Sequence, residues 1–336
     1  MVHRARACRH RAHARASAAA AARAPQRPWR QAVSDLEATA ELLAATFPES
    51  GVGDVSYLRW LYREAPDGPV IETNLDDALG RAAHYALVPV PLTVDGAPVA
   101  GAVSLNTAVH HRARGGGVFT RLAQDTLGLA VDRGVELVVG VANANSTPGF
   151  TRRLDFTSLG PLPARVHLPT GPGRGVSGTR VDQALLADPA LREELARRLA
   201  VAPRGSGITR RWTVDALLWR LARPGARYSL HRLPGVLAVS TVQRTHGVPV
   251  AVVLKVLADD LLSPREARRL VNGICRHHRA PLGLHVGVAP ALPLRNLRLP
   301  DRLRPSPLNF IVRALPDGTI APASLGTFEL LDFDAY

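Results

Sequence analysis

Residues 105–160 read LNTAVHHRARGGGVFTRLAQDTLGLAVDRGVELVVGVANANSTPGFTRRLDFTSLG, and this stretch decides the fold. A strand-like run at residues 99–109 leads into a basic, glycine-rich turn at residues 112–117. A helix follows at once, because apolar residues recur every three to four positions, and Gly134 ends it. A mostly apolar strand at residues 135–141 comes next, so the pattern predicts strand, glycine turn, helix and strand.

Such a glycine turn between a strand and a helix is suited to binding an anion. Glycine lets the backbone approach a ligand closely, and the first N–H groups of the helix lack internal partners. The helix dipole also favours negative charge at that end. Arg112 and Arg114 add cations at the same place. For the glycines taken alone, a plain exposed turn in an arginine-rich protein is the alternative.

The turn resembles motif A of the GNAT superfamily of acyl-CoA-dependent N-acyltransferases, whose pattern is Gln/Arg-x-x-Gly-x-Gly/Ala. With Arg114 first, the glycine position is Gly117, and Phe119 stands where a small residue is expected. With Arg112 as the first residue, Gly115 and Gly117 complete the pattern. In that register, however, the buried face of the following helix begins one helical step too far along the sequence from the motif. We prefer the Arg114 register.

Other landmarks agree with the resemblance in order and spacing over residues 30–160. The apolar strand is followed by Asn143, and a short helix ends in Leu154-Asp155-Phe156 where the family has a Leu-Gly-Phe-like motif. Upstream, the sequence predicts two helices and three strands, with a hairpin at Asp95-Gly96 and a weak first strand near residues 29–33. The predicted elements are helices at residues 34–47 and 55–64 and strands at residues 70–72, 82–94 and 99–109.

The order of elements repeats in the second part of the chain. The helix around Trp212 and Trp219 echoes the one around Tyr57 and Trp60. Strands follow at residues 227–230, 235–242 and 249–257, then a helix from Ser263 with a capping box, and strands at residues 282–288, 308–314 and 327–333. The junction before that helix carries two aspartates and no glycine run, so this half should not bind CoA.

We therefore expect an α/β (α+β) fold: a mixed, mostly antiparallel sheet flanked by helices, in two tandem GNAT-like domains. The expected divisions are a disordered basic tail (1–26), a domain with the acyl-CoA site (27–163), a linker (164–187) and a degenerate GNAT-like domain (188–336).

The resemblance implies a site for acetyl-CoA, or another acyl-CoA, as co-substrate. The pyrophosphate would bind the backbone of the glycine turn, and the pantetheine arm would run beside the preceding strand. A backbone N–H near Ala108 or Val109 would polarise the thioester carbonyl, and the amine would attack directly. The implied cofactor-binding residues are Thr107, Ala108, Val109, Arg112, Arg114, Gly115, Gly116, Gly117, Val118, Phe119, Asn143 and Asn145.

Direct attack requires a general base for the amine. His84 is the preferred candidate, and His110, His111 and Glu72 are alternatives; each histidine taken singly also reads as an ordinary strand or turn residue. The family's tyrosine general acid falls at Thr151, which cannot act as an acid near neutral pH. Tyr85 or water would replace it, unless the leaving thiolate needs no donor.

No metal site is predicted. His277 and His278 are adjacent, but no third ligand is spaced for them. The two cysteines, Cys8 and Cys275, form neither a metal-binding spacing nor a disulfide framework, which makes a reducing cytoplasmic setting the default.

The amino-acid composition limits the classes of binding partner that we expect. The net charge is +14, but eight arginines without an acid in residues 1–30 carry +8 of it, and aromatic residues make up only 5%. We therefore expect no nucleic-acid partner. No apolar run is long enough to span a membrane. The expected partner is a small-molecule amine such as an amino sugar or amino acid, and a homodimer is an option. The alternative function is a non-catalytic, CoA-binding or structural GNAT-like protein.

Overall fold

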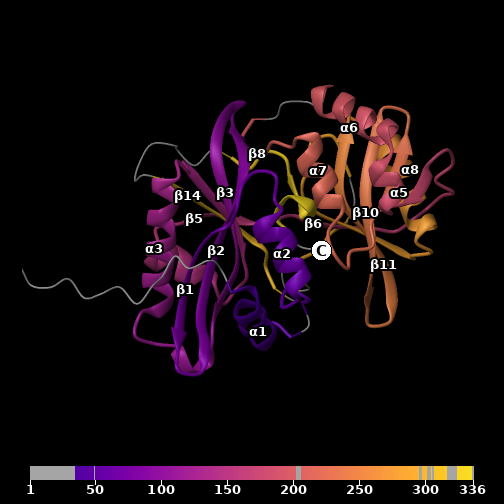
Figure 1. The fold of residues 1–336 in the computed structure, drawn as a ribbon. Coiled ribbons are helices and arrows are strands. Elements are labelled where there is room, and N and C mark those ends of the chain that lie inside the picture. Colours follow the sequence, from indigo (N-terminus) through magenta and orange to yellow (C-terminus); the bar gives the residue numbers. More distant parts are fainter. Residues whose placement is uncertain are drawn as a thin grey trace, which may run out of the picture.

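Two β-sheets lie side by side in the computed structural model, each flanked by helices (Figure 1). The structure describes residues 35–48, 50–201, 206–294, 297–300, 304, 306–315 and 324–334. The expected tail at residues 1–26 and the weak strand near residues 29–33 lie outside this range. Within it, the mixed, mostly antiparallel sheets confirm the predicted fold class.

The N-terminal half follows the predicted order of elements. It contains α1 (Leu36–Thr46), α2 (Val55–Arg63), β1 (Ile71–Asp77), β2 (Gly80–Val94), β3 (Ala97–Val109), the 3-10 turn η1 (His111–Ala113), α3 (Val118–Asp132), β4 (Leu137–Ala142), α4 (Thr147–Arg153) and β5 (Thr157–Pro161). Asp35 and Asp54 cap the first two helices through their side chains. The apolar stripe of α3 packs against β1 and β2.

The C-terminal half begins earlier than the sequence indicates. Its elements are β6 (Ala164–His167), β7 (Ser177–Arg180), α5 (Gln183–Ala187), α6 (Pro189–Val201), β8 (Ile208–Arg210), α7 (Val214–Leu221), β9 (Ser229–Leu233), β10 (Val236–Thr245), β11 (Val248–Ala258), α8 (Pro264–His277), β12 (Leu282–Val288), β13 (Leu297–Arg298), β14 (Asn309–Ala314), β15 (Phe328–Glu329) and the 3-10 turn η3 (Leu330–Phe333). The segment 164–187, expected to be a linker, thus contributes β6 and β7 to the second sheet. Its high proline and glycine content had predicted a linker, so the two short strands were not predicted.

The two halves exchange strands, and β8 of the C-terminal half pairs with β2 in the first sheet. The first sheet has the order β1-β2-β3-β4-β14-β5, so β14 from the end of the chain lies between β4 and β5. The second sheet has the order β13-β6-β12-β11-β10-β9-β7, so β6, which directly follows the N-terminal half, pairs with β12. Each sheet is therefore completed by a strand from across the molecule, as the yellow strand β14 within the magenta half illustrates (Figure 1).

Both halves contain one parallel strand pair joined by a helix. In the first, β3 runs parallel to β4 through α3, and in the second β11 runs parallel to β12 through α8. The predicted capping box of Ser263 and Glu266 starts α8. The predicted strand at 327–333 is wrong beyond Glu329, because the chain turns into η3 to bury Leu330 and Leu331.

In the second half, β15 and η3 fill the space between the diverging ends of β11 and β12. Glu329 pairs with Gly287 of β12 and accepts a hydrogen bond from the backbone N–H of Val256 on β11. Lys255 of β11 forms ion pairs with Glu329 at 3.2 Å and Asp332 at 2.9 Å. None of the described helices is long and apolar enough to cross a membrane.

Candidate functional site

The corresponding space in the first half is open. Strands β3 and β4 pair from Gly101 with Leu137 to Ser104 with Gly140, and beyond that point they diverge. A cavity of about 640 Å³ lies in this fork. It is lined by Thr46, Phe47, Ser104, Leu105, Asn106, Thr107, Ala108, Val109, Arg114, Phe119, Val141, Asn143, Asn145, Ser146, Gly149, Phe150, Leu308 and Ile311. Seven of the predicted cofactor-binding residues are therefore in its wall.

The glycine turn leads from β3 into α3 beside this cavity. Gly115, Gly116 and Gly117 have φ values of 97°, 55° and 73°, a region that residues with a Cβ avoid. Gly117 is the N-cap of α3, so the N–H groups of the first helical turn, starting at Val118, have no partner within the helix. A Cβ added at any of the three glycines would meet no atom within 4 Å, so the turn faces open space.

The two arginines of the turn have different positions. Arg114 lines the cavity and donates from Nε to the carbonyl oxygen of Val109 at 3.3 Å. Arg112 instead donates to both carboxylate oxygens of Asp77, at 2.8 and 3.2 Å. The side chain of Arg112 therefore ties the turn to the β1–β2 hairpin.

A bulge interrupts β3 where it borders the cavity. Opposite β2, Leu105 pairs with Ala86 and Ala108 pairs with His84, so Asn106 and Thr107 have no register partner. Asn106 has a left-handed φ of 52°. A bulge re-aims side chains and leaves backbone groups outside the ladder, and here it turns both residues toward the cavity.

His84 lies behind the cavity wall and is fully buried. Its Nε2 is 2.8 Å from the Tyr62 hydroxyl, which accepts a hydrogen bond from Asn106 Nδ2 at 3.2 Å. On its other side, Nδ1 is 2.7 Å from Asn74 Oδ1 and 3.6 Å from a carboxylate oxygen of Glu72. Burial, and then the charge of Arg81, lower the pKa of His84 to about 3. The imidazole is therefore neutral at physiological pH.

Tyr85 is likewise fully buried, and burial raises the pKa of its phenol well above the usual value. Its hydroxyl accepts a hydrogen bond from Ser104 Oγ at 2.9 Å. Ser104 is at the vertex of the fork, where it pairs with Gly140 and lines the cavity. Ser104 therefore connects Tyr85 to the cavity, a link that the sequence analysis missed.

Comparison with known proteins identifies the N-terminal half. The family model of the GNAT acetyltransferase domain matches residues 31–159. Residues 31–159 are a GNAT domain. No curated protein sequence matches the chain significantly.

Solved structures share the arrangement of both halves. A GCN5-related N-acetyltransferase from Anabaena variabilis has a TM-score of 0.60 at 16% identity, over 85% of this chain and 72% of that one. N-myristoyltransferase from Saccharomyces cerevisiae with bound myristoyl-CoA has a TM-score of 0.56 at 12% identity. That match covers 89% of this chain and 88% of the myristoyltransferase chain. At these identities the likeness shows the fold.

Two departures from the GNAT pattern are accommodated by their surroundings. The Phe119 ring packs edge-on against the Phe150 ring, with the ring centroids 5.4 Å apart. A Cβ at Gly149 would lie 3.0 Å from a carbon of the Phe119 ring. Gly149 therefore makes room for the large residue. Asp155, where the family has glycine, adopts a left-handed φ of 52°, a conformation that aspartate tolerates better than most residues.

Some of the remaining predicted residues of the GNAT domain line the cavity, and others make structural contacts only. Asn145 lines the cavity, whereas the side chain of Asn143 also accepts hydrogen bonds from the N–H groups of Asn145 and Ser146 and so shapes the turn. The rings of His110 and His111 lie beyond the end of β3 and outside the cavity lining, with their centroids 4.2 Å apart and their planes tilted by 36°. The Thr151 hydroxyl donates back to a carbonyl of its own helix.

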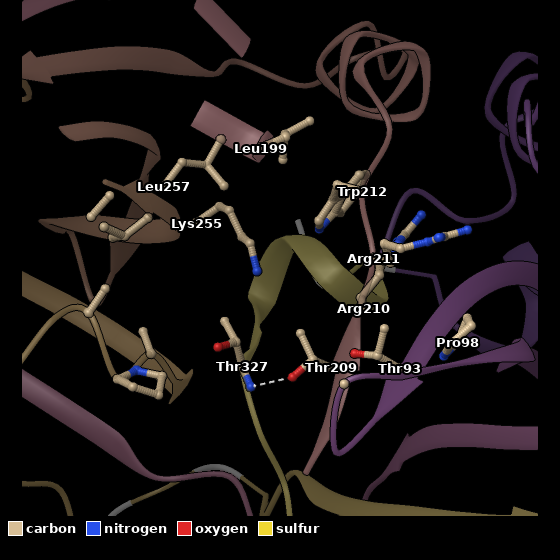
Figure 2. A pocket seen from close by; sticks show the side chains of 16 residues that line it. Thr93, Pro98, Leu199, Thr209, Arg210, Arg211, Trp212, Lys255, Leu257 and Thr327 are labelled. Atoms are coloured by element: carbon tan, nitrogen blue, oxygen red, sulfur yellow. Dashed lines mark hydrogen bonds between the residues drawn. The ribbon is translucent and has the colours of Figure 1, made fainter. Parts of the chain in front are cut away.

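A second cavity of about 640 Å³ lies between the halves, and Figure 2 shows its lining. Arg210, Arg211 and Trp212 form one wall, and Lys255 reaches from the other toward η3 (Figure 2). The Lys255 ammonium is already bound to Glu329 and Asp332. The lining includes no glycine turn at a helix start, so this cavity lacks the phosphate-binding features of the fork in the GNAT domain.

Proposed function

We propose that the protein is an acetyl-CoA-dependent N-acyltransferase that acts on a primary amine of a small molecule such as an amino sugar. A GNAT domain implies acyl transfer from an acyl-CoA, and the observation that carries the proposal is the continuous path along β3. It runs from the glycine turn to the fork at Ser104 and Gly140, with the cavity beside it.

In this proposal the CoA pyrophosphate binds the N–H groups at the start of α3, assisted by Arg114. The pantetheine arm follows Thr107, Ala108 and Val109 toward the fork. The bulge at Asn106 and Thr107 supplies the backbone donor for the thioester carbonyl, in place of the expected donor near Ala108 or Val109. One such donor is worth about 3 kcal/mol to a transition state. Arg112 acts indirectly, by holding the turn against Asp77.

The amine nitrogen attacks the thioester carbon, the C–S bond breaks, and the thiolate leaves with the electron pair. We propose that Ser104 gives a proton to that thiolate and regains one from Tyr85, while the amine loses its own proton to water, from which Tyr85 is reprotonated. With a pKa of about 3, His84 is a weak base at rest, so its proposed action is through the Tyr62 hydroxyl, which it orients toward Asn106. The C-terminal half, with β15 and η3 in its fork, is proposed to bind no CoA.

The binding step is tested by thermal unfolding with and without acetyl-CoA. Acetyl-CoA at about 100 times its dissociation constant should stabilise the native state by about 2.7 kcal/mol. Gly117→Glu should remove this gain, because it places a carboxylate where the pyrophosphate binds. Gly128→Glu, which adds the same charge at an exposed position in the middle of α3, should retain it. Equal stabilisation of both variants would contradict the proposed site.

The chemical step is tested by following thiol release with a panel of primary amines. The alternative, a GNAT protein that binds CoA without turnover, is favoured by one observation: His84 and Tyr85 are both fully buried. Acetyl-CoA binding with no thiol release for any amine would support that alternative. Amine-dependent release that is lost in Gly117→Glu would support the enzyme.

A further inference from the structure

Three histidines from distant parts of the chain meet in the C-terminal half. His231 is on β9, and His277 and His278 are at the end of α8. The ring centroids of His277 and His278 lie 4.9 and 5.8 Å from that of His231, and 4.9 Å from each other. One nitrogen of each ring lies within 4.8 Å of those of the other two. The third ligand that the sequence did not provide for His277 and His278 therefore comes from β9.

Serine hydroxyls hold one nitrogen of every ring. Ser240 Oγ is 2.7 Å from Nε2 of His231 and 2.7 Å from Nε2 of His278, and Ser229 Oγ is 3.1 Å from Nε2 of His277. The two serines face each other across β9 and β10. Histidines that bind metals are oriented in this way, through a hydrogen bond from the nitrogen that does not bind the ion.

His231 Nδ1 is an unsatisfied buried atom. The His231 side chain is fully buried, and this nitrogen has no hydrogen-bond partner within the part of the chain that the structure describes. An unpaired polar atom in the interior costs free energy, and such atoms are rare in folded proteins. A ligand that accepts the Nδ1 lone pair would remove this cost.

The local electrostatics favour a cation. The cluster is at the carboxyl end of α8, where the helix dipole is negative and stabilises positive charge.

Gly178 lets the backbone of β7 pass close to the rings, because it has no Cβ. A Cβ at this position would lie 2.5 Å from His277 Nδ1 and 3.0 Å from His231 Cε1. His277 is exposed and His278 half-buried, so solvent reaches the cluster from outside. An ion can therefore enter, and water can complete its coordination.

We propose that His231, His277 and His278 form a binding site for a divalent first-row transition metal ion of the zinc type, with water as the remaining ligand. Three neutral imidazoles are suited to zinc, which accepts three protein nitrogens and leaves one position open. The bound ion would join the end of α8 to β9 and stabilise the C-terminal half.

The test is zinc titration of the full chain, purified with no histidine tag and freed of metal by a chelator. Calorimetry with zinc chloride should give one ion per chain. His278→Gln and His277→Gln should each weaken binding by tenfold or more. His246→Gln, which removes an exposed histidine from the β10–β11 turn, should leave it unchanged. Cobalt chloride should give a visible absorption band that is lost in the same two variants.

A variant that keeps every ligand tests the geometry. Gly178→Ala places a methyl group against His277 and His231 and should also weaken zinc binding, while circular dichroism confirms that it folds. The Tm of the wild-type protein should rise with zinc and return with chelator. Absence of zinc binding by the wild-type protein, or equal binding by His278→Gln and the wild-type protein, would overturn the proposal. None of these readouts depends on acyl transfer.

Discussion

Trp60 of α2 and Trp219 of α7 stack with their ring centroids 4.3 Å apart, and each indole N–H donates to the backbone carbonyl of the other residue. The two hydrogen bonds measure 3.0 and 3.2 Å. A contact in which each partner makes the same interaction with the other is typical of two-fold related surfaces. Here the two helices occupy the repeated positions in the sequence, so the pair lies where the two halves face each other.

This pair should stabilise the folded protein by more than the burial of its apolar surface alone would. Trp60→Ala should lower the free energy of unfolding by about 3–5 kcal/mol, because it leaves a large void between the halves. In a double-mutant cycle with Trp60→Phe and Trp219→Phe, we expect a coupling energy of about 0.5–1.5 kcal/mol. Urea unfolding measures both values. A coupling energy near zero would show that the stacked pair is not energetically linked.

Removal of Lys255 should be strongly destabilising. Burial alone would lower the pKa of this lysine, but the charges of Asp332 and Glu329 outweigh it and raise the pKa. Lys255→Met removes the lysine counter-ion of two buried carboxylates, so the free energy of unfolding should fall by about 3–5 kcal/mol. Arg192→Met, which breaks the exposed pair with Asp215, should cost no more than about 1 kcal/mol. Similar losses in the two variants would contradict the role of burial.

His84 should make the protein sensitive to acid. Its pKa is about 3 in the folded state and 6.5 in the reference state, so between these values only the unfolded chain takes up the proton. The contribution of His84 to the free energy of unfolding is therefore fully present above pH 6.5. It falls as the pH drops below that value, by about 1.4 kcal/mol per pH unit. His84→Gln should show a shallower decline when unfolding is measured from pH 7 to pH 4. An identical decline would mean that other groups dominate.

The exchanged strand should make the halves interdependent. Residues 27–163 expressed alone lack β14, whose Phe310 and Ile311 are buried between β4 and β5. Two hydrogen-bonding edges and an apolar surface would be exposed, and we expect this fragment to aggregate. Co-expression with residues 164–336 should restore a soluble complex in size-exclusion chromatography. A folded, monomeric fragment would contradict this prediction.

The proposed proton route through Ser104 predicts non-additive kinetics. Ser104→Ala and Tyr85→Phe should each lower kcat about a hundredfold, the usual order for a general acid, and the double variant should lose little more. Ser158→Ala, at an exposed position of β5, serves as the control and should retain full activity. Fully additive losses would show that Ser104 and Tyr85 act separately.

Local signals made much of the GNAT domain predictable. Apolar periodicity and Gly117 placed the start of α3 correctly, and Asp95-Gly96 placed the hairpin between β2 and β3. Contacts distant in the sequence were not predictable. Residues 309–314 indicate a strand but not that its neighbours are β4 and β5, and nothing near His277 indicates that His231 lies beside it. The bulge at Asn106 likewise depends on pairing with β2, which a single strand does not reveal.

The position of Ile311 also determines when the cavity can first exist during synthesis. Leu308 and Ile311 line the fork, although they come from the last part of the chain, and β14 forms the neighbour of β4. A ribosome must therefore have released the chain as far as Ile311 before the lining of the fork is complete. The nascent N-terminal half has no finished pocket in which a cofactor could assist its folding, so chaperone contact during that interval would fall on the unpaired edge of β4.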